Sequence, residues 1–383
     1  MSLGSNHDVQ RLRDLSLDWL ARKLSIKNDE LFCWIDAGDD RFQPPRYADC
    51  SGKRRLLDVP FRKDRQRFKR LNEVLQWKHL HHRCAHGGVR GCSPFTSARK
   101  HLGANCIVTT DIQDCFPNVT AGKFESELSQ LHLESGLVQF LSKLVLCRDR
   151  IPQGCPTSNI ALNLFFWRFD HWLEGRCLKQ RLAYSRVADD IVISGENPKI
   201  TLDCAIDAHA RLSSMGLCIS DKKWIENGIQ FFKPEMLVHS LSVEGLKTRI
   251  STEHHAKILQ LLEAATGACR SVQAISFLSC VRYRQKLHGW SNYAGQASDP
   301  VRSQIKRVAD VCDQNIVARL RKDEVPHSKA WWTPKHALSI HLAWKERVHR
   351  NSESSAQIDF GRECRSMHNP VDVESIEVRH GTV

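Results

Sequence analysis

The stretch YSRVADDIVISG, residues 184–195, constrains this chain most, because it places two adjacent carboxylates between two β-prone runs. Branched and aromatic residues favour strands, so the runs predict a hairpin with Asp189 and Asp190 at its tight turn. Like charges crowded in this way repel each other unless a cation lies between them. A polar turn is the ordinary explanation for such a dipeptide, and the dipeptide alone leaves that explanation open.

A third carboxylate ends another strand-like run, CIVTTDI at residues 106–112. If Asp111 lies at a strand end near the hairpin, the three side chains can hold two divalent ions about 3.5–4 Å apart, the arrangement that serves in-line displacement at phosphorus. Mg²⁺ suits such a site because it is a hard cation that prefers oxygen ligands, and Mn²⁺ is the expected substitute. The pattern therefore predicts a two-metal site.

The composition indicates a globular protein with a polyanionic partner. The chain has 383 residues, of which 41% are hydrophobic, enough to build a core and two or three subdomains. Lys and Arg total 56 against 43 acidic residues, a formal charge of +13 that suits nucleic acid. A solvated basic surface is the competing explanation.

The cysteines predict neither a disulfide framework nor a standard structural zinc site, because the 15 of them are scattered without a CxxC pair. We expect reduced and mostly buried thiols. One segment concentrates metal-binding side chains without standard spacing, and packing or RNA contact is favoured there over zinc: His79, His81, His82, Cys84, His86 and Cys92.

No run of the sequence reaches the roughly 18 apolar residues that a membrane span needs. Charges are spread through the first 24 residues, which therefore do not resemble a signal peptide. We expect a cytoplasmic protein without a membrane partner.

Helix and strand patterns alternate through the middle of the chain. Residues 53–88 read as a strand that leads into a strongly basic helix, and 157–173 read as one buried helix. Short strands are expected within 230–243, and helices from 251 onward. One predicted helix carries an apolar face formed by Val301, Ile305, Val308, Cys312 and Ile316.

Five motifs occur in one order along residues 50 to 310: HGGVRGCSPFTSARKH, TTDIQDCFPNVT, IPQGCPTSNIALNLFF, VADDIVIS and GLCISDKKW. In these motifs the chain resembles bacterial reverse transcriptases of the retron and phage-defence group, relatives of group II intron enzymes. The resemblance implies an α+β, right-hand polymerase fold. Its expected parts are an N-terminal helical extension (1–50), fingers (51–105), a palm with a small antiparallel sheet and finger elements (106–250), a helical thumb (251–325) and a C-terminal extension and tail (326–383).

The resemblance implies that the three aspartates bind two Mg²⁺ ions, with Ile112 in the same predicted metal site. Lys222 or Lys223 matches the position that faces the leaving pyrophosphate, where a cation stabilises charge or donates a proton. The adjacent lysines leave the choice between them open. In the thumb, Arg282, Arg284 and Lys286 are expected to be available for phosphates.

The resemblance also implies substrate-binding residues. Phe116 matches a bulky residue beneath the sugar that excludes a 2′-hydroxyl, with plain core packing as the alternative. Gln153 and Gly154 match a loop beside the incoming nucleotide and template. Arg54 or Arg55 matches a residue that grips the triphosphate, and an RNA-phosphate contact is an equal alternative.

Three departures from the family pattern stand out. Val187 replaces the usual Tyr before Ala-Asp-Asp, which removes a ring expected under the primer end. Ser97 replaces the Asn of the retron NAxxH pattern, and residues 238–240 read VHS where retron enzymes have VTG. These differences favour a defence-type or stand-alone reverse transcriptase over a strict retron enzyme.

The implied function is RNA-directed DNA synthesis in anti-phage defence. The alternatives are template-independent or protein-primed nucleotide addition, which the Val187 departure leaves open, and a catalytically silent RNA-binding subunit. The expected partners are an RNA template, taken to be a cognate non-coding RNA, deoxynucleotides and the DNA product. An effector protein or a second copy of the chain is a further candidate.

Overall fold

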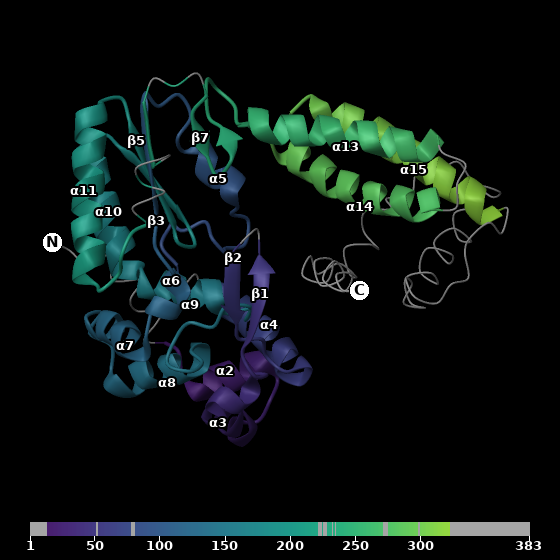
Figure 1. The fold of residues 1–383 in the computed structure, drawn as a ribbon. Coiled ribbons are helices and arrows are strands. Elements are labelled where there is room, and N and C mark those ends of the chain that lie inside the picture. The colour runs from purple at the N-terminus through teal and green to yellow at the C-terminus, as the bar shows by residue number, and fades with distance from the viewer. Residues whose placement is uncertain are drawn as a thin grey trace, which may run out of the picture. The chain divides into compact units, whose positions relative to one another are not determined.

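A computed structural model shows the fold of the chain (Figure 1). The structure describes residues 14–321 except 51–52, 78–80, 221–223, 225–227, 232, 234, 271–274 and 298. The chain forms two compact units: Met1–Leu262 with Leu287–Lys306, and Glu263–Lys286 with Arg307–Val383.

A four-stranded antiparallel sheet lies at the centre of the first unit, in the order β4-β5-β3-β6. Its strands are β3 (Cys106–Asp111), β4 (Ala183–Val187), β5 (Asp190–Gly195) and β6 (Ile229–Phe231). The predicted hairpin and the predicted strand CIVTTD are therefore confirmed, but the turn consists of Ala188 and Asp189, and Asp190 is the first residue of β5. The two inner strands, β3 and β5, are almost wholly buried because helices cover the sheet.

Helices cover both faces of β4, and its side chains show which helix lies on which face. Successive residues of a strand point to opposite faces. Tyr184 and Arg186 hydrogen-bond Asp170 of α10 (Trp167–Lys179), whereas Ser185 hydrogen-bonds Ser97 of α5 (Pro94–Arg99). Helix α11 (Pro198–Ser214) packs along β3 and β5, as Figure 1 shows.

The predicted single helix over 157–173 is wrong in one respect, because the structure contains two helices there. Helix α9 (Ser158–Phe165) ends at Phe166, whose φ of −83° and ψ of 3° turn the chain before α10 begins. The apolar pattern continues through the break because both helices are buried, so the pattern carries no sign of it.

The N-terminal part of the unit is helical except for one hairpin. Its elements are α2 (Leu17–Leu24), α3 (Asn28–Asp36), the 3₁₀ turn η1 (Gly38–Arg41), the paired strands β1 (Arg46–Cys50) and β2 (Lys53–Leu57), and the basic helix α4 (Arg62–Trp77). Three short helices follow β3: α6 (Cys115–Asn118), α7 (Ala121–Ser129) and α8 (Ser135–Val145).

A small three-stranded sheet precedes the last helices: β7 (Leu237–Val238), β8 (Leu241–Ser242) and β9 (Arg249–Ile250). Helices α13 (Thr252–Arg270), α14 (Ile275–Gln296) and α15 (Val301–Arg321) follow, each divided between the two units. In the first unit, the ring of Tyr293 lies 4.9 Å from that of Phe95. No helix within the described ranges is long and apolar enough to cross a membrane.

Among the described residues of the second unit, buried thiols and an ion pair join the helices. The Sγ atom of Cys269 lies 3.6 Å from that of Cys280 and 3.4 Å from that of Cys312. Arg284 donates from Nε to Asp313 at 2.9 Å. A carboxylate thus already binds the Arg284 guanidinium, and phosphate contact by Arg284 stays a prediction.

Candidate active site

The three predicted metal-binding aspartates meet at one end of the central sheet. Asp111 at the end of β3 is paired in register with Asp190 at the start of β5. Partners in an antiparallel sheet have Cα atoms about 4.5–5.5 Å apart and side chains on the same face. Asp189 belongs to the two-residue turn between β4 and β5, and its carbonyl accepts a hydrogen bond from Ile112 N–H at 3.4 Å.

This arrangement fits a pair of divalent cations. The Asp190 side chain is 49% exposed, so solvent and a ligand can reach its oxygens. Cys115 lies fully buried beside the group, and burial together with the Asp189 and Asp111 charges raises the pKa of its thiol well above the usual value. The sulfur is thus a neutral neighbour, and the carboxylates are the groups suited to binding cations.

The turn that carries Asp189 rests on the glycine loop of residues 86–88. A Cβ atom at Gly87 would lie 2.3 Å from the backbone nitrogen of Ala188, so only glycine fits beneath the turn. Ala188 has a φ of +54°, a region that alanine rarely adopts. His86 N–H also donates to the Arg186 carbonyl at 2.7 Å, which aligns the loop with β4.

A buried arginine also holds this turn. Arg186 and Asp170 are both fully buried, and the guanidinium bonds the carboxylate from Nε at 2.9 Å and from Nη2 at 2.6 Å. Its Nη1 donates to the carbonyl of Ala188 at 2.8 Å, and Nη2 also reaches Asn163. Burial lowers the pKa of Arg186, but the Asp170 carboxylate outweighs burial and raises it overall.

Sequence reasoning missed this arginine as a site residue. Its signal was a charged residue in the middle of an apolar strand, AYSRVA, because a charge at such a position needs a buried partner.

The predicted nucleotide-binding loop is attached to the end of β2. The carbonyl of Gln153 accepts a hydrogen bond from Asp58 N–H at 2.7 Å, and Gly154 has a φ of +98°. The Asp58 carboxylate is buried and bonds Arg148 at 2.8 Å and Arg150 at 3.1 Å. These contacts fix the loop against the hairpin that carries Arg54 and Arg55.

The remaining predicted residues occupy three different settings. Arg54 and Arg55 are exposed on β2, and the Arg54 guanidinium lies 4.4 Å from the ring centroid of Tyr47. Phe116 in α6 is half-buried and packs against the core. Lys222 and Lys223 lie outside the described residues. Ser220, shortly before them, donates its N–H to the Asp111 carbonyl at 2.9 Å.

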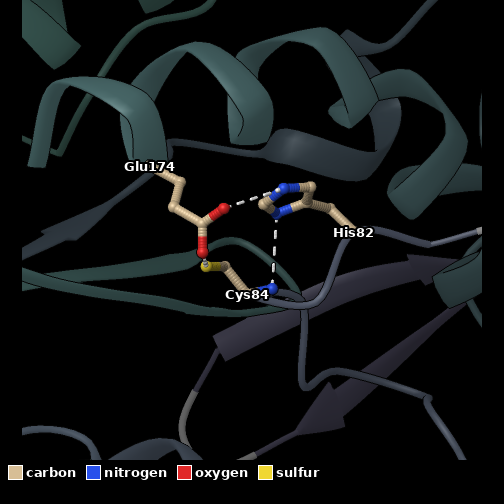
Figure 2. A group of neighbouring side chains, drawn as sticks. All are labelled: His82, Cys84 and Glu174. Atoms are coloured by element: carbon tan, nitrogen blue, oxygen red, sulfur yellow. Dashed lines mark hydrogen bonds and ion pairs between the residues drawn. The ribbon is translucent and has the colours of Figure 1, made fainter. Parts of the chain in front are cut away.

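Of the six predicted zinc candidates, the structure brings His82 and Cys84 together with Glu174 of α10 (Figure 2). Glu174 accepts from Cys84 Sγ at 3.0 Å and from Arg83 Nε at 2.6 Å. Its other oxygen lies 3.3 Å from Nε2 of His82, and Nδ1 of His82 accepts from the backbone N–H of Cys84.

This cluster is satisfied by its own hydrogen bonds. Burial, the largest influence, lowers the pKa of His82 to about 4, so the ring is neutral at pH 7 and has one proton. Because Nδ1 acts as an acceptor, the proton is on Nε2, which can donate to Glu174 but cannot bind a metal. The cluster therefore fits packing between the loop and α10. His79 lies outside the described residues.

Comparisons with known proteins agree with this geometry. A family model described as reverse transcriptase (RNA-dependent DNA polymerase) matches residues 52–231. The retron Ec86 reverse transcriptase of Escherichia coli is 28% identical over 166 residues, which cover 43% of this chain and 51% of that protein. The retron Se72 reverse transcriptase of Salmonella heidelberg is 23% identical over 317 residues, which cover 74% of this chain and 77% of that protein. This chain spans about half the length of the Ec86 relative.

Among solved structures, telomerase from Candida albicans with a fragment of telomeric RNA aligns with a TM-score of 0.42 and 11% identity, over 86% of this chain and 71% of that one. A likeness of this size is too weak to bear on function.

Residues 52–231 match the reverse transcriptase family model, and the relatives are retron reverse transcriptases. These similarities support a retron-type bacterial reverse transcriptase. The α+β fold with a small antiparallel sheet is confirmed. The preference for a non-retron enzyme, drawn from Ser97 and from residues 238–240, receives no support from these relatives, which carry retron names.

Proposed function

We propose that the protein is an RNA-directed DNA polymerase, a nucleotidyltransferase that extends DNA on an RNA template by a two-metal-ion reaction. The observation that carries this proposal is the pairing of Asp111 with Asp190 across β3 and β5, with Asp189 in the adjoining turn. It gathers three carboxylates at one exposed sheet end within a reverse transcriptase domain.

In this proposal the aspartates hold two Mg²⁺ ions, together with Ile112, and Mn²⁺ can substitute. Bound Mg²⁺ stabilises the charge on the attacking and leaving oxygens. The chain itself supplies a preorganised site, because Gly87 and Arg186 fix the turn before any ligand arrives. Lys222 or Lys223 is assigned to the leaving pyrophosphate.

Substrate contacts are assigned to the surroundings of this site. Gln153 and Gly154 form the loop beside the incoming deoxynucleotide, and their link to β2 supports this assignment. Arg54 and Arg55 contact either the triphosphate or RNA phosphates from an exposed hairpin. Phe116 lies under the sugar. The fingers, palm and thumb correspond to residues 51–105, 106–250 and 251–325, flanked by the extensions at 1–50 and 326–383.

Primer extension tests the activity. The wild-type chain should incorporate deoxynucleotides on an RNA template in Mg²⁺, and Asp189→Asn should abolish incorporation while leaving RNA binding intact, because it removes a ligand oxygen without changing shape. Asp203→Asn on the exposed face of α11 is the matched control and should retain activity. Equal activity of Asp189→Asn and wild type at saturating Mg²⁺ would contradict the proposal.

Reactions without a template separate the alternatives. Incorporation that persists without RNA would favour template-independent addition, and a DNA product linked to protein would favour protein priming. RNA binding without incorporation under any condition would indicate a silent RNA-binding subunit.

The proposed partners are a cognate non-coding RNA as template, deoxynucleotides and the DNA product, in the cytoplasm of a bacterium. Sequencing of nucleic acid that copurifies with the protein identifies the RNA, and mass measurement of the assembly detects an effector protein or a second copy. We extend the proposal to anti-phage defence. Phage plating on cells that express wild type or Asp189→Asn tests it, and equal plating would contradict it.

A further inference from the structure

The two retron-pattern departures at residues 97 and 239 contact each other beside the aspartate cluster. Ser97 Oγ lies 2.9 Å from Nε2 of His239, although the residues are 142 positions apart in the chain. The other ring nitrogen of His239, Nδ1, lies 4.0 Å from Oδ2 of Asp190. The imidazole therefore stands between a buried hydroxyl and a predicted metal-binding carboxylate.

The contact continues into the protein as a chain of hydrogen bonds. Ser97 Oγ lies 2.7 Å from Ser185 Oγ, which lies 2.7 Å from Nε2 of His101. Nδ1 of His101 lies 2.7 Å from Ser194 Oγ. All four of these side chains are almost completely buried, between α5 and the face of β4 and β5 that also presents Asp190.

The direction of donation along this chain follows from its end. An ionised carboxylate only accepts hydrogen bonds. If the proton of His239 is on Nδ1 and faces Asp190, Nε2 accepts a hydrogen bond from the Ser97 hydroxyl. Ser97 then accepts from the Ser185 hydroxyl, and Ser185 accepts from Nε2 of His101. The last donor is Ser194, which donates to Nδ1 of His101. The opposite direction would turn a lone pair of His239 toward the carboxylate and is disfavoured.

The imidazole of His101 suits the middle of this chain because it is neutral. Burial, the largest influence, lowers the pKa of His101 to about 3. A neutral imidazole has one donor and one acceptor, so it passes the direction of hydrogen bonding from one neighbour to the other.

The backbone at His239 is arranged for this contact. His239 and Ser240 form the two-residue turn between β7 and β8, with φ values of 51° and 61°. Two successive positive φ values define a type I′ turn, which asparagine and glycine usually occupy. A histidine in this conformation is strained, and strained residues often occur at functional sites.

We propose that His239 is a positioning residue for Asp190, and that the buried chain from Ser194 to Ser97 fixes the ring tautomer that donates to the carboxylate. A distance of 4.0 Å exceeds a direct hydrogen bond, and one bridging water or a shift of about 1 Å in the half-exposed Asp190 closes it. The inference rests on the proposed function, since it assigns Asp190 as a metal ligand. Groups that orient a ligating carboxylate commonly affect metal affinity.

The test measures Mn²⁺ binding to the full chain without nucleotide, by the electron paramagnetic resonance of free Mn²⁺. The relevant sites are those that Asp189→Asn abolishes. We expect His239→Asn and Ser97→Ala each to weaken them about tenfold. Asparagine tolerates the positive φ of the turn, so His239→Asn keeps the backbone while removing the ring. Should that variant fail to fold, Ser97→Ala provides the test alone.

Two further results separate positioning from mere packing. The double variant should bind Mn²⁺ no more weakly than either single variant, because both changes break one chain of contacts. In primer extension, kcat should fall while the KM for deoxynucleotide stays unchanged. The matched control is Ser240→Gly in the same turn, which is outside the chain of contacts and should leave Mn²⁺ affinity as in wild type.

The outcomes distinguish this inference from the proposed function. Asp189-dependent Mn²⁺ binding that is equal in wild type, His239→Asn and Ser97→Ala would overturn the inference and leave the function standing. Additive losses of Mn²⁺ affinity in the double variant would show that His239 and Ser97 do not act through one chain of hydrogen bonds. A wild-type protein with neither Asp189-dependent Mn²⁺ binding nor incorporation would overturn both.

Discussion

Arg186 and Asp170 form a fully buried ion pair directly behind the turn that presents Asp189. The pair joins β4 to α10, and the same guanidinium holds the carbonyl of Ala188. Removing one partner leaves a charge buried without a counterion, which is strongly destabilising.

Arg186→Met is therefore expected to lower the free energy of unfolding by about 3–5 kcal/mol, measured by urea denaturation. Arg176→Met is the matched control, since the Arg176–Asp207 pair in the same helix region is 40% exposed on both sides and should contribute at most about 1 kcal/mol. Similar losses for the two variants would show that burial of the pair has little effect.

Gly87→Ala is expected to abolish or strongly reduce nucleotide incorporation, because the new Cβ would stand 2.3 Å from Ala188 N and displace the turn. Gly175→Ala is the control: it lies inside α10 with no atom within 4 Å of the added carbon. That change should stabilise the protein by about 0.5–1 kcal/mol and preserve activity. Full activity of Gly87→Ala would mean that the turn can shift to accommodate the added Cβ atom without loss of function.

Acid should destabilise the fold before the carboxylates titrate. Burial lowers the pKa values of His82 and His86 to about 4 and that of His101 to about 3, below the usual value of about 6.5. As pH falls below about 6.5 the unfolded chain gains protons that the folded chain does not, so the free energy of unfolding falls. The stabilisation that these neutral histidines contribute is fully present above about pH 6.5 and is lost as the pH falls below that value.

Urea denaturation between pH 7.5 and pH 5 measures this effect, which is at most about 1.4 kcal/mol per pH unit for each histidine. His82→Gln should reduce the slope by one histidine's share, whereas His132→Asn, at an exposed position, should not. An unchanged slope in His82→Gln would show that His82 binds its proton equally well in the folded and the unfolded chain.

Phe116→Ala is expected to raise the use of ribonucleotides relative to deoxynucleotides, since the ring would no longer meet a 2′-hydroxyl. The measurement is the ratio of kcat/KM values for one base in both sugar forms. Phe140→Ala removes another half-buried ring that packs on the same core and serves as control. If both variants lose stability and neither changes the ratio, Phe116 is a core residue only.

Sequence alone located the strands and the aspartates, because the branched and aromatic residues of β4 and β5 and the carboxylates beside them are local patterns. It did not locate the distant residues whose side chains contact each other around those strands. Ser97 and His239 are 142 positions apart, and nothing in either local pattern points to the other. Phe166 is similar: its role as a helix break depends on backbone angles inside a run that is apolar on both sides.

Successive side chains of β4 bind partners on opposite faces of the sheet, and this pattern fixes the register of the strand during folding. Tyr184 and Arg186 bind partners in α10, and Ser185 between them binds partners on the opposite face. A slip of one residue would place the Arg186 charge among serines and leave Asp170 without its counterion. Such a misaligned hairpin is heavily disfavoured, so folding places Asp190 opposite Asp111 and Asp189 in the adjoining turn.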